Sequence, residues 1–248
     1  MPSKTQSAEA TAQAALHAAY PSLGPFKLTP PAFLARHYPS PAVASGFWHS
    51  VPTLLATGAI VFDRPMRRSG AAAPFAAPRV LLVQRDADGS MPLRWETPGG
   101  GCYDNDVSVL RACAYELQLV TGLAAVAVGP LVRCPGSEGS VVDGPAAEEP
   151  ARGDHMGGHI FRAGKDELVF RERKDKLVCK FYFVAEPPTA RLAEVGLHAD
   201  YVRFVWASED EVCSRRTAGD DGVDLTFTTL EQWAVLLEAF KVWRAGHG

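Results

Sequence analysis

Apolar residues along this 248-residue chain follow two periodicities, one typical of a helix and one typical of strands. The helical pattern lies between Trp95 and Leu123, where apolar side chains recur at mixed three- and four-residue spacings. Its stripe consists of Val109, Leu110, Cys113, Ala114, Leu117 and Val120. Gly122 follows the stripe and predicts a left-handed C-cap, while Asp104 and Asp106 are short polar residues able to cap the N-terminus. One amphipathic helix is therefore expected in this stretch.

Short runs rich in β-branched and aromatic residues predict strands on both sides of this helix. The predicted strands cover residues 53–62, 79–84, 124–134, 168–171, 177–185 and 201–207. Ser208 and Glu211 have the spacing of a capping box, which predicts a helix directly after the last strand. A final helix is expected to begin at Thr228 or Thr229 and to carry apolar side chains as far as Trp243.

Two long segments lie outside this pattern of helices and strands. Residues 1–50 are predicted to form an N-terminal arm, with a short helix over 8–19 and aromatic residues spread through a proline-punctuated part. Because exposed apolar patches are unusual, we expect this arm to pack on the domain. Residues 135–166 are rich in glycine, proline and acidic residues, and they exceed the usual loop length. The predicted organisation is an arm, then one domain over 51–248 with an insertion or lid at about 135–166.

A glycine-rich turn, Gly99–Gly101, comes directly before the predicted helix, and glycine allows sharp bends and close backbone approach. Turn and helix together resemble the Nudix box. In that pattern a leading glycine and a loop glutamate precede a helix that ends in Arg-Glu-apolar-x-Glu-Glu-x-Gly-apolar. Gly101 matches the leading glycine, and the end of the pattern is matched by Glu116, Leu117, Gly122 and Leu123.

The resemblance extends over roughly residues 54–243 and implies the Nudix fold, an α/β/α sandwich with a mixed β-sheet. The strands at 53–62 and 79–84 resemble the hairpin that opens Nudix domains. The layout of the box and the C-terminal segment LTFTTLEQWAVLLEAFKVW look most similar to fungal members, in which a role in a biosynthetic pathway is plausible.

The resemblance also identifies what the chain lacks. In the Nudix family the helix glutamates hold magnesium or manganese against a diphosphate, and the box arginine braces one of them. Here Glu116 is present, but Tyr115 stands for the arginine, Leu119 and Val120 for two glutamates, and Val107 for the loop glutamate. Positions i, i+3 and i+4 share a helix face, so apolar side chains replace the oxygen ligands that hard cations need. We therefore expect metal-dependent diphosphate cleavage to be crippled or absent, and no cofactor.

Glu116 is the principal catalytic candidate. Leu119 and Val120 would make its surroundings apolar, and desolvation raises a carboxyl pKa, so that Glu116 could transfer protons near neutral pH. Tyr115 and Tyr103 are candidates for hydrogen bonds to Glu116 or to a ligand. The two apolar residues either form the floor of an apolar ligand pocket or repack an inactive site. The alternative for Glu116 itself is a solvated or salt-bridged side chain.

Asp154, His155 and His159 form the one cluster of histidine and acidic residues in the sequence. Gly157-Gly158 argues against a helix, so the two histidines are not expected to form a metal pair. A histidine of this loop is a candidate acid–base partner for Glu116, with Asp154 as a candidate substrate contact; solvated loop histidines are the alternative. His49 in the arm is a further candidate for substrate binding.

Bulk properties exclude several partners. The formal net charge of −3 gives no basic footprint for nucleic acid, and no apolar run approaches the roughly 20 residues of a membrane span. The five cysteines are scattered, odd in number and without a CxxC pair, which indicates a reducing interior such as the cytoplasm. We therefore expect a small-molecule ligand and no nucleic-acid or membrane partner, and an aromatic arm could join two copies in a homodimer.

Three functions remain open from the sequence. The first is a repurposed enzyme that performs metal-independent acid–base chemistry (isomerisation, cyclisation, dehydration or lyase cleavage) on a small, fairly apolar metabolite. The second is a residual Mg²⁺-dependent Nudix hydrolase of a nucleoside diphosphate derivative, with Glu116, Asp106 and loop acids such as Glu148-Glu149 and Asp166-Glu167 as ligands. The third is a non-catalytic ligand-binding or scaffold protein.

Overall fold

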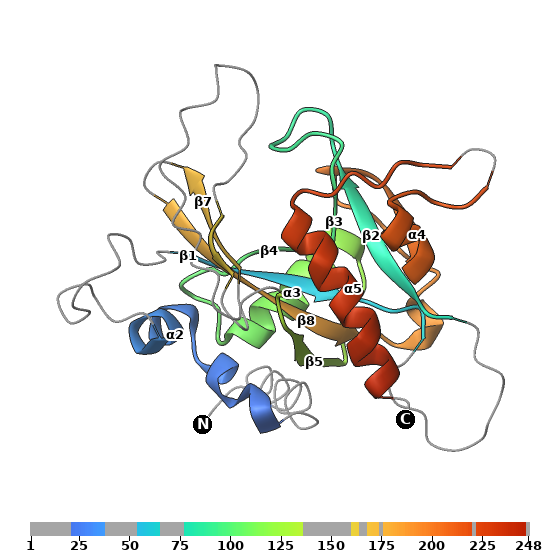
Figure 1. The fold of residues 1–248 in the computed structure, drawn as a ribbon. Helices are drawn as coiled ribbons and strands as arrows, with labels where there is room; N and C mark the ends of the chain where they lie inside the picture. Colours follow the sequence, from blue (N-terminus) through green and yellow to red (C-terminus); the bar gives the residue numbers. More distant parts are fainter. Residues whose placement is uncertain are drawn as a thin grey trace.

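A mixed β-sheet lies at the centre of the structure, a computed structural model that describes residues 21–37, 54–64, 77–135, 160–163, 168–173, 176–219 and 222–246. The larger sheet is six-stranded, with the order β4-β1-β8-β7-β6, and β5 also pairs with β8 (Figure 1). These strands are β1 (Leu54–Ile60), β4 (Gly99–Gly101), β5 (Ala127–Val132), β6 (Ile160–Ala163), β7 (Leu168–Arg173) and β8 (Lys176–Glu186). β1 runs parallel with β8, whereas the other pairs are antiparallel, so the predicted mixed sheet is confirmed.

A smaller antiparallel sheet has the order β3-β2-β9 and stands beside the first. Its strands are β2 (Arg79–Arg85), β3 (Trp95–Glu96) and β9 (Tyr201–Ser208). The predicted hairpin of β1 with β2 is wrong, because the two strands belong to different sheets and are joined by the bridge between Phe62 and Val80. Two backbone hydrogen bonds flank this bridge, from the N–H of Asp63 to the carbonyl of Arg79 and from the N–H of Leu81 to the carbonyl of Val61.

The helices cover opposite faces of the larger sheet. α3 (Val109–Thr121) packs on one face with the 3₁₀ helix η1 (Pro21–Lys27) and α2 (Pro30–His37). The other face carries α5 (Leu230–Ala245), which also contacts α4 (Glu209–Ser214). Successive side chains of β8 alternate between the two cores, because a strand points them to opposite faces. Phe181 and Phe183 join the α3 side, whereas Tyr182 and Val184 join the α5 side. The predicted α/β/α sandwich is thereby confirmed.

Residues 21–37 lie against the α3 side of the core. Phe26 stacks on Phe33 with 5.2 Å between ring centroids, and it meets Phe181 and Phe183 edge-on at 4.9 and 5.1 Å. The backbone N–H of Val109 donates to the carbonyl of Leu28, which ties this segment to the start of α3. The helix expected over 8–19 lies outside the described residues, and the division of the chain into arm and domain stays a prediction.

The ends of the helices confirm some predicted caps and correct others. Gly122 has the left-handed conformation (φ 71°) expected of a C-cap, and Ser208 and Glu211 form the capping box of α4. Thr229 caps α5. The N-cap of α3 is Ser108, not Asp104 or Asp106, because its hydroxyl accepts a bond from the N–H of Arg111.

Part of the segment predicted as an insertion loop is a strand. β6 occupies Ile160–Ala163 and pairs with β7, so the expectation of a loop through residue 166 is wrong over these positions. Residues 136–159 of that segment lie outside the described part. Among the described helices, none combines the length and apolar character that crossing a membrane would require.

Candidate functional site

Glu116 lies on α3 with its carboxylate against the glycine run of β4. Its side chain is 5% exposed. A Cβ atom added to Gly100 would lie 2.2 Å from Oε2 of Glu116, so only glycine leaves room for the carboxylate at this point. Gly100 pairs with Thr57 of β1, which fixes the run in the larger sheet. The leading glycine assigned from the sequence, Gly101, would have nothing within 4 Å of an added Cβ. Gly100 is therefore the glycine that shapes the site.

Burial raises the pKa of Glu116 to about 7, and the negative charge of Asp106 adds to this rise. Asp106 is held in the loop before α3, where its carboxylate accepts a 2.7 Å hydrogen bond from the N–H of Tyr103. A carboxyl group with a pKa near 7 exists in both protonation states at neutral pH. Glu116 can therefore give or take a proton there.

A second buried carboxylate, Glu96 on β3, lies in the neighbouring sheet. The Arg85 guanidinium donates to Glu96 over 2.7 Å, and the Tyr201 hydroxyl donates to the same oxygen over 3.2 Å. Burial raises the pKa of Tyr201, with Glu96 and, more weakly, Glu116 acting in the same direction. Tyr201 thus lies within electrostatic reach of both carboxylates. None of these three residues was among the predicted site residues.

Lys180 extends the same group of polar side chains from β8. It is half-buried, and its Nζ lies 5.2 Å from the ring centroid of Tyr182. Burial lowers the pKa of Lys180 and Arg85 lowers it further, whereas the charge of Glu96 raises it. The Thr97 hydroxyl is fully buried and has no hydrogen-bond partner among the described residues. These groups give the site a polar interior that the box alone does not predict.

For two of the residues that the sequence analysis did not identify, Glu96 and Lys180, the neighbouring sequence offers a signal. Glu96 stands three residues before Gly99 of the glycine turn and is buried on β3, which pairs with β2. Lys180 occupies the same strand face as Val178 and Tyr182, both of them buried. A charged residue in such a row is a signal for a functional group. Arg85 and Tyr201 carry no comparable signal, since they meet Glu96 only through strand pairing.

The predicted site residues are placed unevenly around Glu116. Val120 is buried, 4% exposed, whereas Tyr115, Leu119 and Tyr103 are exposed at 48%, 43% and 57%. The two apolar box replacements therefore do not share one environment, and only Val120 lies in the interior. The predicted His49, Asp154, His155 and His159 lie outside the described residues, so their roles stay predictions.

Among the described residues, few oxygen donors for a divalent metal ion lie around Glu116, and the predicted loop acids Glu148 and Glu149 lie outside those residues. Hard cations take several oxygen ligands, usually from more than one carboxylate. Within the described part of the chain, no group of three or more His, Cys, Asp or Glu side chains is placed to hold a metal ion. Asp106 is the one acid whose charge acts on Glu116 there, and the positions that follow on the helix are apolar.

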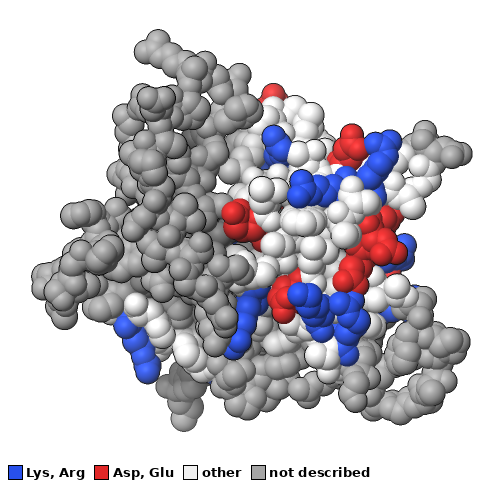
Figure 2. Space-filling model, viewed as in Figure 1, with Lys and Arg blue, Asp and Glu red and all other residues white. Residues whose placement is uncertain are grey.

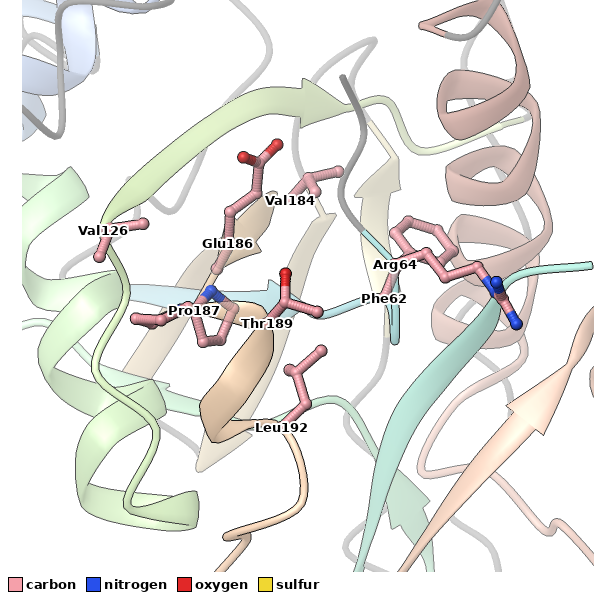
Figure 3. Close-up of a pocket in the computed structure, with 10 residues that line it drawn as sticks. Phe62, Arg64, Val126, Val184, Glu186, Pro187, Thr189 and Leu192 are labelled. Carbon is pink, nitrogen blue, oxygen red and sulfur yellow. The ribbon is translucent and has the colours of Figure 1, made fainter. Parts of the chain in front are cut away.

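A separate cavity of about 200 Å³ lies beyond the ends of β1 and β8 (Figure 3). Its lining is mostly apolar, and its polar groups include Arg64, Glu186 and Thr189. Phe62, in its wall, is five residues beyond Thr57 along the chain, which in a strand is about 16 Å. None of the predicted site residues in the described part of the chain lines this cavity, and it is distinct from the site around Glu116.

The surface charge is mixed where it can be seen. On the face in Figure 2, basic and acidic side chains are interspersed, and no single sign dominates the view. This agrees with the formal net charge of −3. The expectation that the protein binds no nucleic acid stays a prediction.

Comparison with known proteins finds similar solved structures but no match in sequence. No family model matches the chain, and no curated protein matches it. The MutT protein of Methanosarcina mazei is 15% identical with a TM-score of 0.45, over 80% of this chain and 99% of that one. A C. elegans Ap4A hydrolase in a binary complex is 14% identical with a TM-score of 0.44, over 78% and 99%. The Nudix domain of Shewanella oneidensis NrtR, complexed with ADP ribose, is 15% identical with a TM-score of 0.41, over 85% and 97%.

The chain resembles Nudix proteins in fold. These structures are Nudix proteins, in agreement with the predicted resemblance, and at identities of 14–15% the likeness concerns the fold alone. The similarity to fungal Nudix members stays a prediction, since the structures named above come from an archaeon, a nematode and a bacterium.

Proposed function

We propose that this protein is an enzyme in which Glu116 transfers protons on a small metabolite without a bound metal ion. The observation that supports the proposal is the buried Glu116 carboxyl, whose pKa is raised to about 7. A general acid or base works best when its pKa lies near the working pH. Isomerisation, cyclisation, dehydration and lyase cleavage are reactions that such a group can catalyse without a metal.

The proposed substrate is a small, fairly apolar molecule. Apolar residues stand where metal-binding acids would lie in a Nudix box, and the formal net charge of −3 does not favour a polyanion. A place in a biosynthetic pathway and a cytoplasmic location belong to the same proposal. No cofactor is required for proton transfer by a carboxyl group.

The test is turnover of a metabolite extract in the presence of EDTA, followed by mass spectrometry. Wild-type protein should convert at least one compound, and Glu116→Gln should slow the conversion by about 100-fold or more. The matched control is Glu238→Gln, which changes a partly exposed glutamate paired with Lys241 on α5 and should leave the rate unchanged. Full activity in Glu116→Gln would overturn the assignment.

Calorimetry with Mg²⁺ and Mn²⁺ tests the residual hydrolase, which the neighbouring Asp106 and Glu116 carboxylates would favour. Tight binding that disappears in Glu116→Gln, together with phosphate release from a diphosphate panel, would replace our proposal with that function. Ligand binding without turnover in any assay would instead favour a non-catalytic binding protein.

A further inference from the structure

β9 is the outer strand of the smaller sheet, because the order β3-β2-β9 gives it one neighbour, β2, among the described strands. It is eight residues long, Tyr201–Ser208. Val202 and Phe204 are 53% and 37% exposed, and Arg203 between them is exposed as well. Successive side chains of a strand point to opposite faces, so both faces of β9 are open to water over these residues.

The hydrogen bonds of β2 show which of its backbone groups point toward β9. The N–H of Leu81 donates to the carbonyl of Val61, and the N–H of Arg85 donates to the carbonyl of Arg94. Both bonds lie on the side of β2 that faces away from β9. Because the backbone groups of successive strand residues point to opposite sides, those of Leu82, the residue after Leu81, point toward β9.

The register then identifies the unpaired backbone groups of β9. Leu82 lies opposite Val205, so the N–H and C=O of Val205 bond to β2. The same groups of Phe204 and Trp206, on either side of Val205, therefore point outward. Among the described residues, none makes a hydrogen bond to these outward groups. Such a row of free backbone donors and acceptors is a template for a further strand.

The edge of β9 has little of the protection that edge strands usually carry. Lysine, proline and bulges are the common devices, and β9 contains neither lysine nor proline. Its shift in register lies before Arg203, so Phe204 and Trp206 belong to the regular part. The Arg203 Nε donates to the Gln84 side chain over 2.6 Å, and its guanidinium lies 5.3 Å from the centroid of the Trp95 ring. The one charged side chain of β9 is thus bound to its own sheet.

We propose that two copies of this chain form a homodimer by antiparallel pairing of β9 with β9. A two-fold axis at Val205 places Phe204 opposite the partner's Trp206, and the outward backbone groups of both residues are then paired. Aromatic pairs across strands add stability. Arg203 lies opposite the partner's Ala207, so no like charges face each other directly between the two strands. Both β9 edges are used in this pairing, and assembly therefore stops at two copies.

A second copy is the partner that this edge fits, because a two-fold contact needs a surface complementary to itself, and an antiparallel strand edge is one. The sequence predicts that aromatic residues of the arm join two copies, but Phe26 and Phe33 are only 7% and 2% exposed. They pack in the core on the α3 side and do not offer a surface to a partner. The dimer through β9 goes beyond the proposed function, because it concerns a surface and does not use Glu116.

The first test is sedimentation equilibrium of the full chain over a range of concentrations. Wild-type protein should reach twice the mass of one chain, and Phe204→Lys should raise the Kd of the dimer about tenfold or more. The reason is that the variant loses the aromatic pairs and carries a lysine on the edge. Leu230→Lys is the matched control, since it places the same side chain at a 62% exposed position of α5 and should dimerise like wild type. Circular dichroism and urea unfolding check that both variants are folded.

Amide hydrogen exchange tests the same pairing without a substitution. The N–H groups of Phe204 and Trp206 should exchange quickly in dilute protein and become protected as the concentration rises. The N–H of Val205, which bonds to β2, should be protected throughout. A wild-type protein that stays monomeric would overturn the proposal, and so would a dimer that Phe204→Lys leaves intact. Protection of Phe204 and Trp206 in dilute protein would overturn it as well, because another segment of the same chain would then cover the edge.

Discussion

The Glu116 carboxyl is buried on folding and has no cationic partner among the described residues. Its protonated form is therefore favoured in the folded chain. The pKa rises from 4.5 to about 7 on folding. Since the folded state binds the proton more tightly, the stability that this group contributes is fully present below pH 4.5 and is lost as the pH rises through 7. At alkaline pH the buried carboxylate destabilises the fold.

Glu116→Gln should therefore raise the free energy of unfolding at pH 8.5 by about 2 kcal/mol and change it little at pH 4. The expected gain is below what the full pKa shift would give, because solvent near the site screens the charge. Urea unfolding at the two pH values measures it. Glu238→Gln is the control and should show no such gain; an equal effect of Glu116→Gln at both pH values would contradict the raised pKa.

Among the single residues of the site, some could be predicted from the sequence. Glu116 was found because the glycine turn and the helix end flank it at a recognisable spacing. Glu96, Arg85 and Tyr201 could not be found in the same way. They lie on three strands, and their contacts at 2.7 and 3.2 Å exist only once β2 pairs with β3 and β9.

At the scale of elements, the three glycines of β4 differ in how much space each leaves for a side chain. A Cβ at Gly99 would lie 2.2 Å from the backbone oxygen of Thr57, which belongs to the paired strand and cannot move freely. A Cβ at Gly100 would meet the Glu116 side chain, and one at Gly101 would meet nothing within 4 Å. Gly99 is therefore required by the packing of the sheet and Gly100 by the Glu116 side chain, whereas a larger residue would fit at Gly101.

Alanine substitutions should separate these demands. Gly99→Ala should lower the free energy of unfolding by about 3 kcal/mol through overpacking against the backbone. Gly101→Ala should stay within about 0.5 kcal/mol of wild type. Gly100→Ala should keep most of the stability but displace Glu116, and so flatten the pH dependence that this residue supplies. Urea unfolding across pH checks all three; equal losses at the three positions would contradict the assignment.

The elements themselves were mostly predictable, and the failures have physical causes. Every residue of the predicted α3 stripe is buried, because a helix keeps its periodic face regardless of what covers it. The predicted cap is wrong because aspartate and serine are both good N-caps, and the extended φ of −166° at Ser108 and its hydrogen bond from Arg111 exist only in the folded chain. The hairpin of β1 and β2 failed because sequence neighbours need not share a sheet.

For the whole molecule, the segment over 21–37 acts as part of the core. Phe33 is 2% exposed and stacks on Phe26, and it also meets Phe181 of β8 edge-on at 5.4 Å. Aromatic side chains bury large areas, and such pairs add to that burial. The part of the α3 face around Phe181 and Phe183 would be left open to water without this segment.

Phe33→Ala should therefore lower the free energy of unfolding by about 3 kcal/mol, through lost burial and the cavity left behind. Arg36→Ala, at an exposed position of the same helix, should change it by less than about 0.5 kcal/mol. Urea unfolding followed by fluorescence and circular dichroism provides the measurement. A loss below 1 kcal/mol for Phe33→Ala would mean that the segment contributes little, in contradiction to its burial.

β8 pairs with β1 on one side and with β7 and β5 on the other, so one late segment holds the larger sheet together. Its residues follow those of β1 by more than a hundred positions in the chain. During synthesis, the aromatic residues near the N-terminus leave the ribosome long before Phe181 and Phe183, which complete their cluster. Apolar side chains in the first half of the chain therefore stay exposed until β8 has been synthesised. The nascent protein consequently depends on its late residues to reach the native sheet.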